Sequence, residues 1–348
     1  MPTLRRTQRV RTAIDLFSGC GGLTEGLKTA GFRVLGAVEV DGVAAETYQL
    51  NHPEVRLWTK DIRSLGTRSV ARKLNLRKGQ LDLLAGCPPC QGFSTMRTLN
   101  GRRSNRDKRN DLLFEVVRFA KALRPKAVMI ENVPGLSTNS RFRDFCSQLG
   151  KLGYTGEHRI LNAARYGVPQ RRNRLIYLAA RDQEVAFGKQ SGEQKTVRSA
   201  ISALRPAGKS GDPLHDMPEH RSPGVARIIK AVPKNGGGRT DLPYEQQLDC
   251  HKSCNGFKDV YGRMAWDEVA PTITTGCFNP SKGRFLHPVR NRAITIREAA
   301  LLQGFPKRYK FDVKHGKVAL ALMIGNALPP PFIAAHARAI RATLHNRS

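Results

Sequence analysis

The pattern of hydrophobic and polar positions predicts that the chain begins with strands and helices in alternation. Segments with helical spacing cover residues 23–30, 110–124 and 140–149, and Pro125 ends the second of them. Strands alternating with helices are typical of an α/β fold with a mainly parallel sheet. Short apolar runs of strand type cover residues 12–17, 33–40, 55–59, 81–85, 126–130, 154–161 and 175–180.

The second half of the chain differs from the first in composition and in hydrophobic pattern. From Arg181 to about Arg290 it is rich in Gly, Pro and polar residues, with no sustained helical or strand period. Order returns at Thr295-Ile-Arg-Glu298, a capping box that starts a helix. Two further helices are predicted over residues 318–323 and 332–344. We therefore predict a basic tail over 1–11, one domain formed by 12–181 together with 295–348, and a second, irregular domain over 182–294.

The net charge of the chain indicates which class of molecule the protein binds. The 348 residues include 59 Lys and Arg against 28 Asp and Glu, a net charge of +31 that favours a polyanion such as nucleic acid. A basic, ribosome-associated surface is the alternative. No apolar run approaches membrane-spanning length and no secretory signal is evident, so we expect no membrane association. Seven cysteines, an odd number, favour a reducing cytoplasm over a disulfide framework.

The first strand leads into a glycine turn. Ser18-Gly19-Cys20-Gly21-Gly22 stands between this strand and a helix, as at the start of a nucleotide-binding unit. Glu39 follows Gly19 by 20 residues, the distance at which an acid meets ribose hydroxyls. The turn lacks both G-x-G-x-x-G and a P-loop lysine. A nucleoside without pyrophosphate, such as S-adenosylmethionine, is therefore expected.

Two further strand ends carry polar residues. Asp61 is suited to accept a hydrogen bond from an adenine amino group, while the aliphatic Ile62 covers the adenine ring. Asp61 is equally suited to cap the segment that follows it. The strand over 126–130 delivers Glu131, a carboxylate that serves chemistry, a helix cap or a turn.

The sequence Cys87-Pro88-Pro89-Cys90 follows the strand over 81–85. A thiol on a proline-stiffened loop at the tip of a strand is where an α/β enzyme places a nucleophile. A redox pair or half of a zinc site are the alternatives for this C-x-x-C. Cys250, His251, Cys254 and Cys277 form only a weak zinc pattern, and we predict no metal.

Basic residues flank these candidates. The segment over 100–110, with five cations and one acid, suggests a lid that closes on phosphates. Arg172 and Arg174 alternate with Asn173, so an extended backbone points both side chains to one face, where they can hold an anion or polarise a carbonyl. Surface arginines on an edge strand are the alternative.

Taken in order, six stretches resemble the DNA (cytosine-5) methyltransferases. Their order and spacing span nearly the whole chain outside the irregular region. They are Asp15-Leu-Phe-Ser-Gly-Cys-Gly-Gly22, Pro88-Pro-Cys-Gln-Gly-Phe-Ser94, Glu131-Asn-Val133, Gln170-Arg-Arg-Asn-Arg174, Arg297-Glu-Ala-Ala-Leu-Leu-Gln-Gly-Phe-Pro306 and Gly325-Asn326.

The resemblance implies a Rossmann-like domain that binds S-adenosylmethionine, with residues 182–294 as a target-recognition domain. It places Phe17 against the adenine, Glu39 at the ribose, Asp61 at the adenine amino group and Asn326 near the methionine end. The full implied cofactor set is Phe17, Gly19, Gly21, Gly22, Glu39, Val40, Asp61, Ile62, Pro89 and Asn326.

The resemblance also implies a mechanism. Cys90 would add to C6 of a flipped-out cytosine, Glu131 would bond at N3, and Arg174, supported by Arg172, would steady O2. We expect a monomeric bacterial enzyme that acts on duplex DNA in the cytoplasm, and a restriction endonuclease is its expected functional partner. A tRNA cytosine methyltransferase, faintly suggested by Cys277-Phe278, and a non-catalytic DNA-binding regulator are the alternatives.

Overall fold

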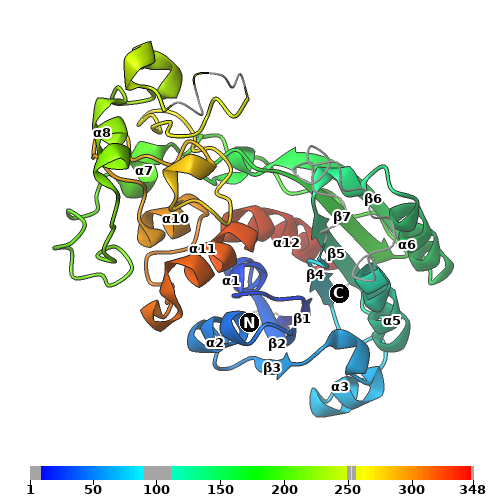
Figure 1. Cartoon of the computed structure of the whole chain (residues 1–348). Coiled ribbons are helices and arrows are strands. Elements are labelled where there is room, and N and C mark those ends of the chain that lie inside the picture. Colours follow the sequence, from blue (N-terminus) through cyan, green and yellow to red (C-terminus); the bar gives the residue numbers. More distant parts are fainter. Residues whose placement is uncertain (1–8, 90–110, 249–251, 253–255, 346–348) are drawn as a thin grey trace, which may run out of the picture.

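Figure 1 shows the computed structural model, which describes residues 9–89, 111–248, 252 and 256–345. Its centre is a seven-stranded sheet in the order β3-β2-β1-β4-β5-β7-β6. The first five strands of this order are parallel, whereas β7 is antiparallel to both β5 and β6. The predicted mainly parallel α/β sheet is confirmed. The strands are β1 (Arg11–Leu16), β2 (Phe32–Glu39), β3 (Arg56–Thr59), β4 (Leu83–Gly86), β5 (Ala127–Asn132), β6 (Tyr154–Asn162) and β7 (Asn173–Arg181).

Helices cover both faces of the sheet, which explains why the central strands β1, β4 and β5 are buried along their whole length. Successive residues alternate between faces, so Ala13 and Leu83 join one core while Ile14 and Leu84 join the other. The first core contains α1 (Gly22–Thr29) and α12 (Pro330–His345), and the second contains α5 (Leu113–Leu123) and α6 (Ser140–Lys151). Figure 1 shows these two layers on opposite sides of the sheet.

The sequence predicted α1, α5, α6 and α12 but missed α2 (Gly42–Asn51) and α3 (Thr67–Lys73). Asp41, two residues beyond Glu39, is the N-cap of α2 and accepts from the Ala44 amide at 2.8 Å. Small buried residues follow it, so the helix has little amphipathic contrast to detect. Helix α3 is short and begins at Gly66 without a side-chain cap.

The expectation of no sustained helical period over residues 182–290 was wrong at α8 (Pro223–Ala231). Ser222 caps this helix, Pro223 occupies its first turn, and apolar residues recur at helical spacing. These are ordinary helix signals. The sequence analysis did not predict this helix because Gly and Pro are frequent in the residues around it.

A third cluster of buried apolar residues holds together the part of the molecule beside the sheet. We call this part, which comprises the described residues between 197 and 326, the second lobe. The cluster combines side chains from 197–214, 264–294 and 305–311 with α10 (Ile296–Leu302) and α11 (Gly316–Asn326). Figure 1 shows α7 (Val197–Ile201), α8, α10 and α11 gathered beside the sheet. The predicted domain boundary at residue 294 stays a prediction, and it crosses this shared core. The predicted capping box at Thr295 and Glu298 is confirmed.

One stretch, Val313–Leu344, has the length and composition of a membrane span, and 61% of its most apolar window is buried inside the protein. It consists of a 3-10 turn and the two helices α11 and α12, separated by Ala327-Leu-Pro329. Phe332, Ile333 and Ile340 of α12 belong to the core that covers the sheet. The apolar character of this stretch therefore has a use within the fold.

Arg263 organises the irregular part of the second lobe. Its side chain is fully buried and donates to the carbonyl oxygens of Ile229, Val232, His287 and Arg290 at 2.5 to 3.0 Å. A planar guanidinium with five donors can join loops that lack strand pairing. Burial lowers the pKa of Arg263 from its usual value.

Replacing Arg263 with lysine should therefore destabilise the protein. Lysine has a single donor centre, so several buried carbonyls would lose their partner, at a cost of about 1–3 kcal/mol each. We expect Arg263→Lys to lower the free energy of unfolding by at least about 2 kcal/mol in urea titration. The exposed Arg227 of α8 offers a matched control, since Arg227→Lys should leave the midpoint unchanged. Equal midpoints for both variants would contradict this role.

Candidate active site

Strand direction brings the candidate side chains to one edge of the sheet. The parallel strands β1, β2, β4 and β5 end there, and the antiparallel β7 begins there. Asn132, the last residue of β5, pairs with Leu175 of β7. Arg174 therefore reaches the same edge as Glu131, although the two residues stand at opposite ends of their strands.

Glu131 is the centre of the described site. Its side chain is buried, with only 2% of the residue exposed. Arg174 Nε lies 2.8 Å from Oε1, and Cys87 Sγ donates to Oε2 at 2.9 Å. The sequence had singled out Glu131 and Arg174, but it gave no sign that Cys87 would contact either of them.

The predicted nucleophile Cys90 and the basic segment over 100–110 lie outside the described residues. Pro89, the last described residue before this gap, is partly buried. Asn132 Nδ2 donates to the carbonyl oxygen of Pro88 at 3.0 Å, which ties the start of this loop to the end of β5.

Arg172 and Arg174 contact different partners. The guanidinium of Arg172 is buried and donates to the carbonyl oxygens of Ile273 and Gly325 at 3.0 and 2.8 Å. It therefore joins the start of β7 to the 273 segment and the end of α11. We had expected both arginines to hold one anion from one face of the strand, but they contact different partners. Alternation along a strand fixes the direction of each Cβ and not the path of a long side chain.

The glycine turn requires backbone freedom. Gly19 and Gly21 have φ of +54° and +96°, a region that favours glycine. At Gly22 a Cβ would lie 2.4 Å from the Leu328 carbonyl oxygen, so the turn after α11 approaches the loop too closely for a side chain. Phe17 also has a positive φ, +63°, at the end of β1. Asn326, the last residue of α11, is exposed two residues before this contact.

Glu39, the last residue of the neighbouring strand β2, accepts a hydrogen bond from the glycine turn, which we also call the glycine loop (residues 18–22). Oε2 accepts from the Gly19 amide at 2.7 Å, and Oε1 accepts from the amides of Val40 and Asp41 at 2.9 and 2.8 Å. Burial raises the pKa of Glu39, while these amides oppose the shift. The acid that the sequence placed near a ribose is thus oriented in advance by backbone donors.

Asp61 is the N-cap of a 3-10 turn, which is one of the two readings left open by the sequence. Its side chain accepts from the Arg63 amide at 2.9 Å and pairs with the Arg63 guanidinium. Hydrogen bonds from Arg63 lower the pKa of Asp61. Ile62 is buried in the core at 3% exposure, whereas Val40 is 67% exposed.

No group of His, Cys, Asp and Glu in the described residues has the arrangement of a metal site. Cys277 is buried, and desolvation raises its pKa to about 12. Cys250, His251 and Cys254 lie outside the described residues.

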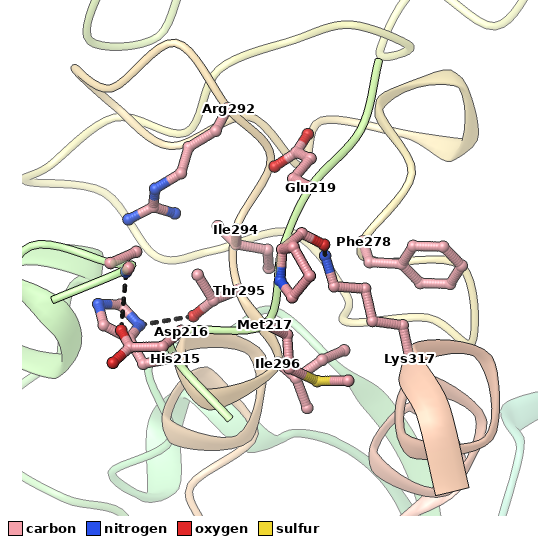
Figure 2. A pocket seen from close by; sticks show the side chains of 13 residues that line it. His215, Asp216, Met217, Glu219, Phe278, Arg292, Ile294, Thr295, Ile296 and Lys317 are labelled. Carbon is pink, nitrogen blue, oxygen red and sulfur yellow. Dashed lines mark hydrogen bonds between the residues drawn. The ribbon is translucent and has the colours of Figure 1, made fainter. Parts of the chain in front are cut away.

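Figure 2 shows a cavity of about 180 Å³ whose lining residues lie between Ala207 and Lys317. Its charged lining already has partners, since Lys317 donates to the Pro218 carbonyl and Arg292 pairs with Glu298. His215 Nδ1 lies 2.7 Å from Thr295 Oγ1. This cavity shares no residue with the predicted site.

Comparison with known proteins decides the family. A family model of C-5 cytosine-specific DNA methylases matches residues 11–342. The chain is 36% identical to the Type II methylase M.HgiDII of Herpetosiphon aurantiacus over 337 residues, covering 92% of each protein. The chain belongs to the C-5 cytosine-specific DNA methylase family. It is a DNA (cytosine-5)-methyltransferase, as the resemblance implied.

Other relatives agree with this assignment. The methylase is 34% identical to the Type II methyltransferase M1.HphI of Haemophilus parahaemolyticus, with 94% of this chain and 86% of that protein covered. A solved structure from an E. coli prophage, described as a DNA modification methyltransferase, has a TM-score of 0.70 and 24% identity, covering 96% of this chain and 99% of that one. The likeness to this structure supports the fold.

Beneath its glycine loop the methylase carries a buried polar network that sequence reasoning missed. Thr24 Oγ1 donates to Asp15 Oδ2 at 2.7 Å and lies 2.9 Å from the Tyr48 hydroxyl. The Tyr309 hydroxyl donates to the Cys20 carbonyl at 2.6 Å and lies 3.0 Å from His52 Nε2, and the His52 ring contacts that of Tyr48. Tyr309 belongs to the second lobe's core, so this contact joins that lobe to the loop.

Asp15 should make stability depend on pH. Burial raises its pKa to about 8, well above the value of about 3.9 in an unfolded chain. Between these values the folded state keeps a proton that the unfolded state has released, so stability falls as pH rises. From pH 5.5 to 8.5 we expect Asp15 to cost the wild type about 3 kcal/mol.

Comparing wild type with Asp15→Asn in denaturant at both pH values isolates this effect. The other titrating groups cancel in the difference, and the neutral amide should gain on the wild type as pH rises. A difference independent of pH would contradict the raised pKa.

Proposed function

We propose that the enzyme transfers the methyl group of S-adenosylmethionine to C5 of a cytosine within a specific duplex DNA sequence. The observation that carries this proposal is the buried Glu131, with Arg174 on one carboxylate oxygen, at the sheet edge where the glycine loop also lies. A carboxyl and a guanidinium side by side match the N3 and O2 positions on one edge of a cytosine.

The glycine loop and its neighbours would hold the cofactor. The absence of side chains at Gly19, Gly21 and Gly22 would let the methionine end approach the backbone, with Asn326 close by. When bound, S-adenosylmethionine supplies a methyl group activated by its sulfonium. The other proposed contacts are Phe17, Ile62, Val40 and Asp61 at the adenine, Glu39 at the ribose, and Pro89 beside the reacting methyl.

Glu39 fits this role because its carboxylate is already oriented by three amides. Lone pairs that these amides do not use would accept from ribose hydroxyls. Asp61 would have to share its carboxylate with Arg63 to accept from an adenine amino group.

The chemistry proceeds through a covalent adduct in this proposal. The Cys90 thiolate adds to C6 of the cytosine, Glu131 donates a proton to N3 and Arg174 steadies O2, which makes C5 nucleophilic. C5 then takes the methyl group. Loss of the C5 proton and departure of Cys90 restore the aromatic ring. The base must first leave the helix, at a cost of a few kcal/mol that phosphate contacts by the strongly basic chain would offset.

Arg172 takes a different part in this scheme from the one first expected. Its buried contacts with Ile273 and Gly325 support a positioning role, which keeps the start of β7 and therefore Arg174 in place. Direct contact between Arg172 and the base is not part of the proposal.

The named relatives are Type II methylases, and we propose that this enzyme likewise protects cytoplasmic DNA beside a restriction endonuclease, acting as a monomer. Residues 182–294 would supply the sequence recognition. A tRNA substrate remains the alternative to be tested.

Duplex DNA should be the substrate. With labelled S-adenosylmethionine, we expect methyl transfer to duplex DNA and none to tRNA. Bisulfite sequencing of DNA from cells expressing the enzyme should then reveal protected cytosines in one short sequence context. Labelling of tRNA alone would overturn the proposal.

Two substitutions test the chemical roles. Cys90→Ser should abolish turnover while DNA affinity changes less than about threefold, because a hydroxyl is a far weaker nucleophile than a thiolate at neutral pH. Glu131→Gln should lower kcat at least about 100-fold. Cys146→Ser in α6 and Glu157→Gln in β6 are matched controls that should retain wild-type turnover. Wild-type rates in either test variant would refute the corresponding role.

A further inference from the structure

The Cys87 thiol is not among the residues to which the family resemblance gives a role, yet it contacts the carboxyl group at the centre of the site. Its Sγ lies 2.9 Å from Glu131 Oε2, on the carboxylate oxygen that Arg174 does not hold. Glu131 is 2% exposed, so solvent gives its carboxylate little further support.

The terminal torsion of a glutamate has broad minima, so one contact leaves the plane of the carboxylate poorly defined. Contacts at both oxygens, from different strands, define it. The alignment of that plane decides how the acid meets a planar base. We propose that Cys87 is a positioning residue that sets the orientation of Glu131 before cytosine enters, an inference that rests on the proposed function.

The backbone around Cys87 is suited to such a task. The Cys87 amide donates to the Leu16 carbonyl of β1 at 3.2 Å, and the following Pro88 restricts the conformation of Cys87. At Gly86 a Cβ would lie 2.9 Å from the same Leu16 carbonyl oxygen, so β4 runs tightly against β1 here. The thiol therefore projects from a well-defined position.

A thiol suits this position chemically. It is a weak donor, so it orients the carboxyl group without holding it as firmly as an N–H or O–H group does, and Glu131 keeps hydrogen-bonding capacity for the base. The same side chain packs as a small apolar group against the core beneath the sheet. Packing alone is thus the competing explanation for Cys87.

Paired substitutions separate the two explanations. Serine keeps a donor but packs less well in an apolar setting, whereas alanine keeps apolar character and has no donor. If Cys87 orients Glu131, Cys87→Ala should lower kcat about 5- to 20-fold in single-turnover methylation of duplex DNA, and Cys87→Ser should stay within about threefold of wild type. Cofactor affinity should be unchanged in both. Alanine as active as serine, or more active, would overturn the inference.

A double-mutant cycle on unfolding tests the contact without relying on turnover. Melting of wild type, Cys87→Ala, Glu131→Gln and the double variant should show non-additive shifts, since the two side chains touch. Additive shifts would overturn the inference. Failure of the wild type to methylate duplex DNA would instead refute the proposed function, while the cycle still reports on the contact.

Discussion

The ion pair between Glu131 and Arg174 depends on two adjacent strands running in opposite directions. In an entirely parallel sheet, residues at the start of one strand lie at the edge opposite to residues at the end of its neighbour. Reversal of β7 brings an arginine from a strand's beginning to the carboxyl edge, where the glycine loop also lies. The acid and the cation thus meet at the ends of two adjacent strands whose central residues are buried, a support that a site on loops alone would lack.

The glycine loop depends on parts of the chain that are distant in sequence. Leu328 fills the space that a side chain at Gly22 would need, and Tyr309 binds the carbonyl of Cys20. Both residues come from the last 40 residues of the chain. A turn without side chains is inherently loose, so the surrounding contacts supply the rigidity that glycine gives up. The C-terminal segment is therefore structural support for the glycine loop as well as part of the hydrophobic core.

Much of this organisation could be predicted from sequence. Apolar periodicity located the strands, and the strand ends singled out Glu39 and Glu131 before their neighbours were known. The helix α2 was missed because its small buried residues give weak contrast, and α8 because local composition hid a regular period. The contacts of Cys87 and Arg172 were beyond reach, since each joins segments whose proximity only the fold creates. Alternation along a strand predicts to which face of the sheet each Cβ points. It does not predict where the guanidinium at the end of a long arginine side chain lies.

The buried guanidinium of Arg172 has a thermodynamic consequence. It bonds the 273 segment and the last turn of α11 at once, and that turn lies beside the glycine loop. Two surfaces that share one rigid anchor cannot be ordered independently. Loosening one of these two segments would therefore loosen the other as well, so both should open as one cooperative unit.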